Sequence, residues 1–371
     1  MMTLETTDAN YKKVKVAVVL GLAFFTYMNM RDNIKKLYAD VGAGDWYKTP
    51  ETVSYLKDNL KDNERVTSEL YFYASYPYFI TNPAVWNDPV THLNLRNLLP
   101  PFSGLLYDIP QNVGAANSGG LKISRYNELE SEIYFNGLKQ DEKGDFSLSD
   151  SFLFLNRIMG VKYILSNKEF SSYVTSVAKK FEMPQGEDPI FIYEFFDYFP
   201  RQFLVPHAEK EEPEKIKEHL LKADFEPKDH VYIEEDSDWG AKGGYSANSR
   251  FAKYTDTEVV IKTQASGDGY LFLSDTYYPG WKAYIDGKEE KIYLANYAFR
   301  AVQVPQGEHE VTFKYEPESV KYGISISLIT GGIFLIFLIG ITIVKITQNL
   351  KLKSQRYNLK LKSNLKDFKG I

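Results

Sequence analysis

Four aromatic residues and one carboxylate gather around a Pro-Gly turn in the last third of the chain. They are Asp275, Tyr277, Tyr278, Trp281 and Tyr284. Amphipathic rings can pack on the C–H faces of sugars while a carboxylate accepts hydrogen bonds from sugar hydroxyls. The combination predicts a carbohydrate-binding surface. The alternative is that the rings fill a β core and Asp275 accepts bonds from turn amides, since strand alternation prevents all five from lining one site.

A second candidate is Arg201, which follows Pro200 where a strand is expected to begin. The planar guanidinium group pairs with carboxylates and with phosphates. Two interpretations follow. Arg201 is either a buried arginine that pairs with a carboxylate across a domain interface, or an anion contact that reaches a phosphate.

Other site chemistry is not indicated. The absence of cysteine removes disulfides, thiolate metal sites and cysteine nucleophiles. No pair of histidines has the helical spacing of metal ligands, and we expect neither a metal nor a cofactor. A glycine-rich phosphate loop and a Ser-His-Asp arrangement are also not found. The five histidines are His92, His207, His219, His230 and His309.

The aromatic cluster belongs to a region with strand patterning. Short runs that favour strands are separated by turn signals, including Asp286-Gly287, which is typical of a tight hairpin. This spacing predicts an antiparallel β-sandwich over residues 241–318. The expected strands cover residues 250–254, 257–264, 269–275, 281–286, 290–294, 298–304 and 309–315.

Residues 31–240 have a different pattern, in which helices alternate with strands. One example is a short apolar helix over residues 152–158, ended by Gly160 and followed by a buried strand at 161–165. Such alternation is typical of a mixed α/β domain. The predicted fold class is therefore α+β, with an α/β-type domain followed by the sandwich.

Two hydrophobic segments flank these domains. Residues 322–344 contain no charged residue, and at about 1.5 Å per residue they cross a hydrocarbon core of about 30 Å. Residues 14–30 are less clear, because a short apolar core also fits a signal peptide. We expect an uncleaved transmembrane helix there, since no small-residue cleavage site follows.

The distribution of charged residues predicts on which side of the membrane each segment lies. Residues 345–371 contain eight basic residues and one acidic residue, whereas the whole chain has a formal net charge of −5. Basic tails stay in the cytoplasm. Residues 1–13 and 345–371 are thus predicted to be cytoplasmic, and the acidic central region extracytoplasmic. The acidic central region also argues against a nucleic-acid partner and leaves the lipid bilayer as the expected one.

Several separate motifs resemble the C-terminal part of YfhO-like bacterial membrane proteins, in the same order along the chain. They lie at residues 155–165, 199–205, 223–227, 269–287 and 304–317, and the last is followed by the apolar helix. That family is similar to glycosyltransferases of the GT-C class, which use lipid-linked sugars and place catalytic carboxylates in the first external loop of a many-helix bundle. No counterpart of that loop is found here, so the resemblance implies no catalytic residue in this chain.

Two functions are compatible with these observations. The first is a membrane-anchored extracytoplasmic region of a YfhO-like glycosyltransferase, which assists glycan or acceptor binding, or assembles with a polytopic helix bundle. Its partners would include cell-envelope glycan or a lipid-linked sugar. The second is a stand-alone structural or adhesion protein of the cell envelope. The chain could be a fragment, a split gene product or a complete protein.

Overall fold

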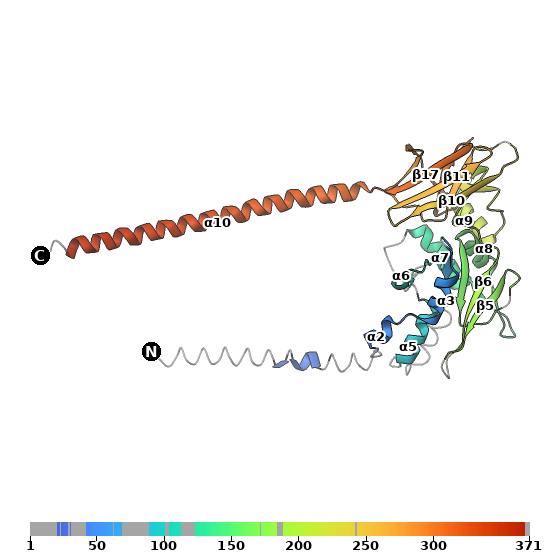
Figure 1. Cartoon of the computed structure of the whole chain (residues 1–371), viewed down its shortest axis with the longest axis horizontal. Helices are drawn as coiled ribbons and strands as arrows, with labels where there is room; N and C mark the ends of the chain where they lie inside the picture. Colours follow the sequence, from blue (N-terminus) through green and yellow to red (C-terminus); the bar gives the residue numbers. More distant parts are fainter. Residues whose placement is uncertain are drawn as a thin grey trace. The chain divides into compact units, whose positions relative to one another are not determined.

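The structure is a computed structural model in which the chain divides into two units. The first comprises Met1–Tyr278 and Lys282–Lys314, and the second comprises Pro279–Trp281 and Tyr315–Ile371. Figure 1 shows the order of the elements. The structure describes residues 21–22, 24–28, 30, 42–61, 63–68, 89–100, 104–112, 123–170, 172–183, 188–241 and 243–367.

A four-stranded sheet forms the centre of the N-terminal part of the first unit. Its order is β1 (Arg65–Thr67), β4 (Val161–Ser166), β6 (Ile190–Phe195) and β5 (Thr175–Phe181), with β1 parallel to β4 and the other pairs antiparallel. Every residue of β4 is buried, because both faces of the sheet are covered. Tyr163 and Leu165 pack with Val53 and Leu56 of α3 (Glu51–Asn59), whereas Ile164 belongs to the larger core on the other face.

Three helices contribute to that larger core. They are α7 (Ser124–Asn136), α8 (Asp150–Ile158) and α9 (Pro213–Lys222). Ser149 caps α8 by accepting a hydrogen bond from the backbone N–H of Phe152 at 3.2 Å. The remaining short elements are α2 (Ala43–Tyr47), α5 (Pro89–Leu95), the 3-10 helix η2 (Arg96–Leu98), α6 (Gly104–Tyr107), β2 (Leu138–Gln140) and β3 (Phe146–Leu148).

A six-stranded sheet packs against these helices. Its order is β7 (Gln202–Val205), β12 (Gly269–Leu273), β16 (Phe299–Val304), β15 (Tyr293–Ala295), β9 (His230–Ile233) and β8 (His207–Lys210). The β8–β9 pair is parallel and the other pairs are antiparallel. Its strands come from both sides of residue 240, where the sequence had suggested a boundary.

The six-stranded sheet must curl on itself. Strands β7 and β8 stand at opposite ends of the strand order, yet only Pro206 separates them in sequence. Neighbouring strands are about 4.8 Å apart, so the edges of a flat sheet of this size would lie about 24 Å apart. The two Cα–Cα steps from Val205 through Pro206 to His207 span at most about 7.6 Å. The chain therefore bends at Pro206 and passes from one end of the sheet to the other.

A five-stranded antiparallel sheet completes the folded region. Its order is β10 (Ala247–Tyr254), β11 (Glu258–Ala265), β17 (Gly307–Tyr315), β13 (Trp281–Ile285) and β14 (Lys288–Glu290). Burial alternates along β11, as expected when one face is covered. Ser249 donates to the carbonyl oxygen of Gln202 at 3.2 Å, so β10 contacts β7. The α+β class is confirmed, whereas a separate antiparallel sandwich remains a prediction.

The Asp286-Gly287 hairpin is confirmed. Ile285 pairs with Lys288, so the two residues between them form the whole loop. Both have positive φ, 50° for Asp286 and 86° for Gly287, which is the backbone of a type I′ turn. The dipeptide alone was sufficient to locate this turn.

The second unit contains α10 (Glu318–Asp367), which includes the predicted span at residues 322–344. Residues Glu318–Asn358 form a helix long and apolar enough to cross a membrane, and its most apolar window is 0% buried. It is the single such helix within the part of the chain that the structure describes. Of the predicted segment at residues 14–30, positions 21, 22, 24–28 and 30 are helical, and the rest lies outside the described residues. The second span stays a prediction.

Substitution of Gly160 by alanine tests the junction between α8 and β4. Gly160 has φ +74°, and an added Cβ would lie 2.7 Å from Arg201 Cγ. Gly287 has φ +86° with open space around it, so Gly287→Ala carries backbone strain alone. We expect Gly160→Ala to lower the free energy of unfolding by about 1–3 kcal/mol, and by more than Gly287→Ala does. Urea unfolding of the full chain in detergent measures both, and equal losses would contradict the predicted clash.

Candidate functional site: a buried carboxylate held by three arginines

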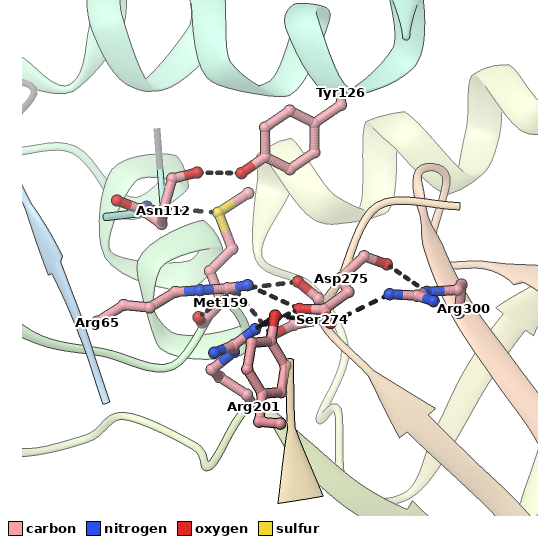
Figure 2. A network of polar contacts seen from close by, with 9 residues as sticks. Arg65, Asn112, Tyr126, Met159, Arg201, Ser274, Asp275 and Arg300 are labelled. Carbon is pink, nitrogen blue, oxygen red and sulfur yellow. Dashed lines mark hydrogen bonds and ion pairs between the residues drawn. The ribbon is translucent and has the colours of Figure 1, made fainter. Parts of the chain in front are cut away.

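Asp275 lies at the centre of a buried ionic cluster (Figure 2). Its carboxylate contacts three arginines from distant parts of the chain. The separations are 2.8 Å from Arg65 Nη2 to Oδ1, 2.6 Å from Arg201 Nη2 to Oδ1, and 3.1 Å from Arg300 Nη2 to Oδ2. The side chain of Asp275 is 9% exposed, and those of the arginines are 11%, 4% and 3% exposed respectively.

Strand register brings two of the arginines to Asp275. Leu273 of β12 pairs with Gln202 on one side and with Arg300 on the other. The N–H of Ser274 donates to the carbonyl oxygen of Arg201 at 2.8 Å, which continues the β7–β12 pairing by one residue. Asp275, two residues after the end of β12, therefore lies close to both Arg201 and Arg300.

Arg65 joins the four-stranded sheet to the same cluster. Its Nη1 donates to the carbonyl oxygens of Met159 and Ser274, both at 3.0 Å, and to Ser274 Oγ at 3.2 Å. Its backbone N–H donates to the carbonyl oxygen of Gly160 at 2.9 Å. The side chain thus connects β1, the end of α8 and the segment after β12.

Tyr254 of β10 provides the remaining contact. Its hydroxyl donates to Asp275 Oδ2 at 3.2 Å and accepts a hydrogen bond from Arg201 Nη2. The guanidinium carbon of Arg201 lies 4.2 Å from the centre of the Tyr254 ring, which adds a cation–π contact. The cluster therefore includes a residue of the five-stranded sheet as well.

The electrostatics of the cluster favour an ionised carboxylate. Burial alone would raise the pKa of Asp275, but the charges of Arg201, Arg65 and Arg300 outweigh it and hold the pKa well below its usual range. Burial lowers the pKa of Arg65, and the charge of Arg201 adds to this effect. Three guanidinium groups therefore contact this one carboxylate.

The arrangement is a closed ionic contact. A carboxylate has about four acceptor sites, and two arginines on Oδ1 with Arg300 and Tyr254 on Oδ2 use four. Its low pKa also makes Asp275 a poor general base near neutral pH. Arg201 pairs with a buried carboxylate, in agreement with the first of its two interpretations. Arg201 Nε is buried and has no hydrogen-bond partner among the described residues.

The predicted aromatic residues have varied environments. Tyr277 is partly buried and its N–H donates to the carbonyl oxygen of Ala298 at 2.8 Å, whereas Tyr278 is 49% exposed. In β13, Trp281 alternates in phase with the buried Ala283 and Ile285, so Tyr284 points to the opposite face. Since Asp275 is enclosed and fully engaged, it does not offer a carboxylate beside the exposed Tyr278.

Trp281 also has a partner close to the start of α10. Its ring centre lies 5.4 Å from that of Tyr315. This contact belongs to the second unit, where the N–H of Glu316 donates to the carbonyl oxygen of Gly280 at 2.7 Å. The carbohydrate site formed by these five residues stays a prediction.

Sequence reasoning did not identify Arg65 and Arg300 as site residues. Arg300 had a local signal, because it lies within the apolar run Phe299-Arg300-Ala301-Val302, where a charge requires a buried partner. Arg65 had none, since its partner lies 210 residues further along the chain.

Comparisons with known proteins bear on the C-terminal part of this region. Residues 246–327 match the family model described as bacterial membrane protein YfhO, and they include Asp275 and Arg300. A Bacillus subtilis (strain 168) protein named "Uncharacterized protein YfhO" is 35% identical over 72 residues, which are 19% of this chain and 8% of that protein. No solved structure matches. The expected resemblance to YfhO-like bacterial membrane proteins is confirmed over residues 246–327, and with α10 it fits association with a lipid bilayer.

Removal of the charge on Asp275 should destabilise the fold. Asp275→Asn preserves the size of the side chain but removes the negative charge that three buried arginines contact. We expect a loss of about 3–5 kcal/mol in the free energy of unfolding. The matched control, Asp256→Asn, changes an exposed turn residue and should stay within about 0.5 kcal/mol of the wild type. Urea titration followed by circular dichroism measures both, and similar values for the two variants would contradict a stabilising cluster.

The same carboxylate should make stability depend on acid pH. An aspartate in an unfolded chain titrates near pH 3.9, and the folded pKa of Asp275 lies below that value. Its contribution is therefore fully present above about pH 4 and is lost as the pH falls further toward the folded pKa. The stability difference between wild type and Asp275→Asn should shrink below about pH 4. A difference that remains constant from about pH 5 to about pH 2 would show that Asp275 is not the titrating group.

Proposed function

We propose that this chain is the membrane-anchored extracytoplasmic region of a YfhO-like membrane glycosyltransferase. In this proposal it assembles with a polytopic helix bundle that carries the catalytic loop. In the same proposal the chain assists glycan or acceptor binding, and the exposed Tyr278 is the candidate contact for the glycan. The basic residues after position 344 support a cytoplasmic C-terminus and a folded region on the outer face.

The observation that carries the assembly role is the surface of α10. The helix begins within three residues of the end of β17, and its apolar side chains are exposed on every side. In a membrane such a surface contacts lipid or other helices, so it can attach the folded region to a bundle. The closed cluster around Asp275 supports a structural role for the folded region over a catalytic one.

The alternative function is that of a stand-alone protein without a helix-bundle partner. A stand-alone structural or adhesion protein of the cell envelope would also need an anchor and a rigid outer domain. The two proposals differ in what α10 contacts, which is lipid alone in the stand-alone protein and a neighbouring helix bundle in the assembly.

Co-purification tests the assembly role. The full chain is expressed in a bacterial membrane with a candidate YfhO-like bundle protein, solubilised in mild detergent and isolated through a tag on the bundle. We expect the chain to co-elute with the bundle. Elution of the chain alone, with intact folding shown by circular dichroism, would favour the stand-alone function.

A pair of glycine substitutions makes this test specific. Gly323, Ser327 and Gly331 follow one another at four-residue spacing, so they lie along one face of α10, where small residues permit close helix contact. Gly340 lies nine residues beyond Gly331, which places it on the opposite face at 100° per residue. We expect Gly331→Ile to reduce co-elution while Gly340→Ile leaves it unchanged. Equal retention by both variants would count against helix packing through this face.

A further inference from the structure

Two histidines and one glutamate converge on the β8–β9 strand pair. His207 and Glu209 alternate in phase on β8, so both side chains leave the same face of the sheet. In the parallel pairing, His207 lies opposite His230 of β9. The three residues are thus brought together by strand register, although 19 residues lie between Lys210 and His230 in the sequence and this stretch includes α9.

Their ligand atoms have the spacing of a metal site. Glu209 Oε1 lies 3.6 Å from His207 Nε2 and 3.8 Å from His230 Nδ1, and one ligand atom from each residue lies within 4.8 Å of the others. Tetrahedral zinc with bonds of about 2.0–2.1 Å holds its ligands about 3.4 Å apart. Small rotations of the exposed side chains of His207 and Glu209 close the remaining difference.

The surrounding residues hold the imidazoles in place. The side chain of His230 is 12% exposed, and its ring packs edge-on to Tyr232 at 4.7 Å and against Phe225 at 5.4 Å. The rings of His207 and His230 are stacked with centres 5.9 Å apart. His207 also forms an antiparallel bridge with Gly240, so the backbone of β8 is paired on both sides at this position. The His230 ring and the backbone of β8 are therefore held in place without a metal, whereas the side chains of His207 and Glu209 stay free to adjust.

We propose that His207, Glu209 and His230 form a binding site for a divalent transition metal of the zinc type. His207 Nε2, His230 Nδ1 and Glu209 Oε1 supply three ligands, and the fourth position faces solvent because His207 and Glu209 are 45% and 51% exposed. Two imidazoles with one carboxylate suit zinc, whereas calcium and magnesium prefer sites built from oxygen ligands. This proposal does not depend on the proposed glycosyltransferase assembly, and it departs from the expectation that the chain binds no metal.

Zinc binding by the full chain in detergent provides the test. After treatment with a chelator, the chain is titrated with Zn²⁺ by calorimetry, and with Co²⁺ to follow the visible absorption of the bound ion. We expect one ion per chain and a rise in Tm with Zn²⁺. Glu209→Gln and His207→Asn should each weaken zinc binding by about 10- to 100-fold or more. Loss of a residue that only hydrogen-bonds to a metal ligand already has an effect of this size, and these two residues are ligands themselves. Neither Mg²⁺ nor Ca²⁺ should compete.

The matched control is His309→Asn. His309 Nδ1 lies 2.6 Å from Asp286 Oδ2, so it is also a histidine beside a carboxylate, but it lies on the five-stranded sheet and lacks a second imidazole. It should bind zinc as the wild type does. Absence of zinc binding, or equal affinity in wild type, Glu209→Gln and His207→Asn, would overturn the proposal. The exposed ligands are chosen for substitution because loss of the buried His230 could disturb folding, and circular dichroism of the metal-free variants confirms that they fold.

Discussion

The charge on Asp275 constrains more of this fold than any other single group that we describe. A carboxylate taken from water requires a nearby positive charge and several hydrogen bonds, and three arginines and a tyrosine provide them. Those arginines lie 210, 74 and 25 residues away in sequence, so the requirement can be satisfied only when β1, β7, β12 and β16 are all assembled. Buried ion pairs are often worth little in net stability, but they penalise wrong arrangements heavily. We interpret the cluster as a device that selects one arrangement of the sheets.

The ionic cluster also selects one pairing register between the strands that carry its residues. A shift of β16 by one residue would turn Arg300 to the opposite face of the sheet and bring Phe299 or Ala301 opposite Leu273, where Arg300 now lies. The same shift would separate the buried Arg300 from the Asp275 carboxylate, and separating a buried ion pair is far more costly than misplacing an apolar side chain. Apolar packing alone would distinguish these registers weakly, because the residues around Arg300 are uniformly apolar. The ionic cluster therefore complements the hydrophobic cores.

Features that depend on consecutive residues could be predicted from the sequence, whereas contacts between residues far apart in the sequence could not. The hairpin at Asp286-Gly287, the end of α8 at Gly160 and the apolar span at residues 322–344 each depend on a few consecutive residues, and the structure contains all three. The six-stranded sheet depends on pairing between strands such as β7 and β12, which no local pattern specifies. For the same reason Asp275 was interpreted with its sequence neighbours Tyr277 and Tyr278, whereas its actual partners come from other strands. The nearest clue was the arginine at position 300 within an apolar strand.

Pro206 lies in the sequence between a residue of the Asp275 cluster and a residue of the proposed metal site. Arg201 lies just before β7 and His207 begins β8, so the two clusters share one short stretch of chain on either side of the proline. Proline has no N–H to donate to a strand partner, which makes it suited to a position where one strand pairing ends and another begins. The ionic cluster fixes the β7 end of the sheet, whereas β8 is held by its parallel pairing with β9 and a single bridge to Gly240. A metal bound by residues of β8 and β9 would add a second link between these two strands, where the sheet curls. It would stabilise the β8 end of the strand order, as the arginine–Asp275 contacts stabilise the β7 end.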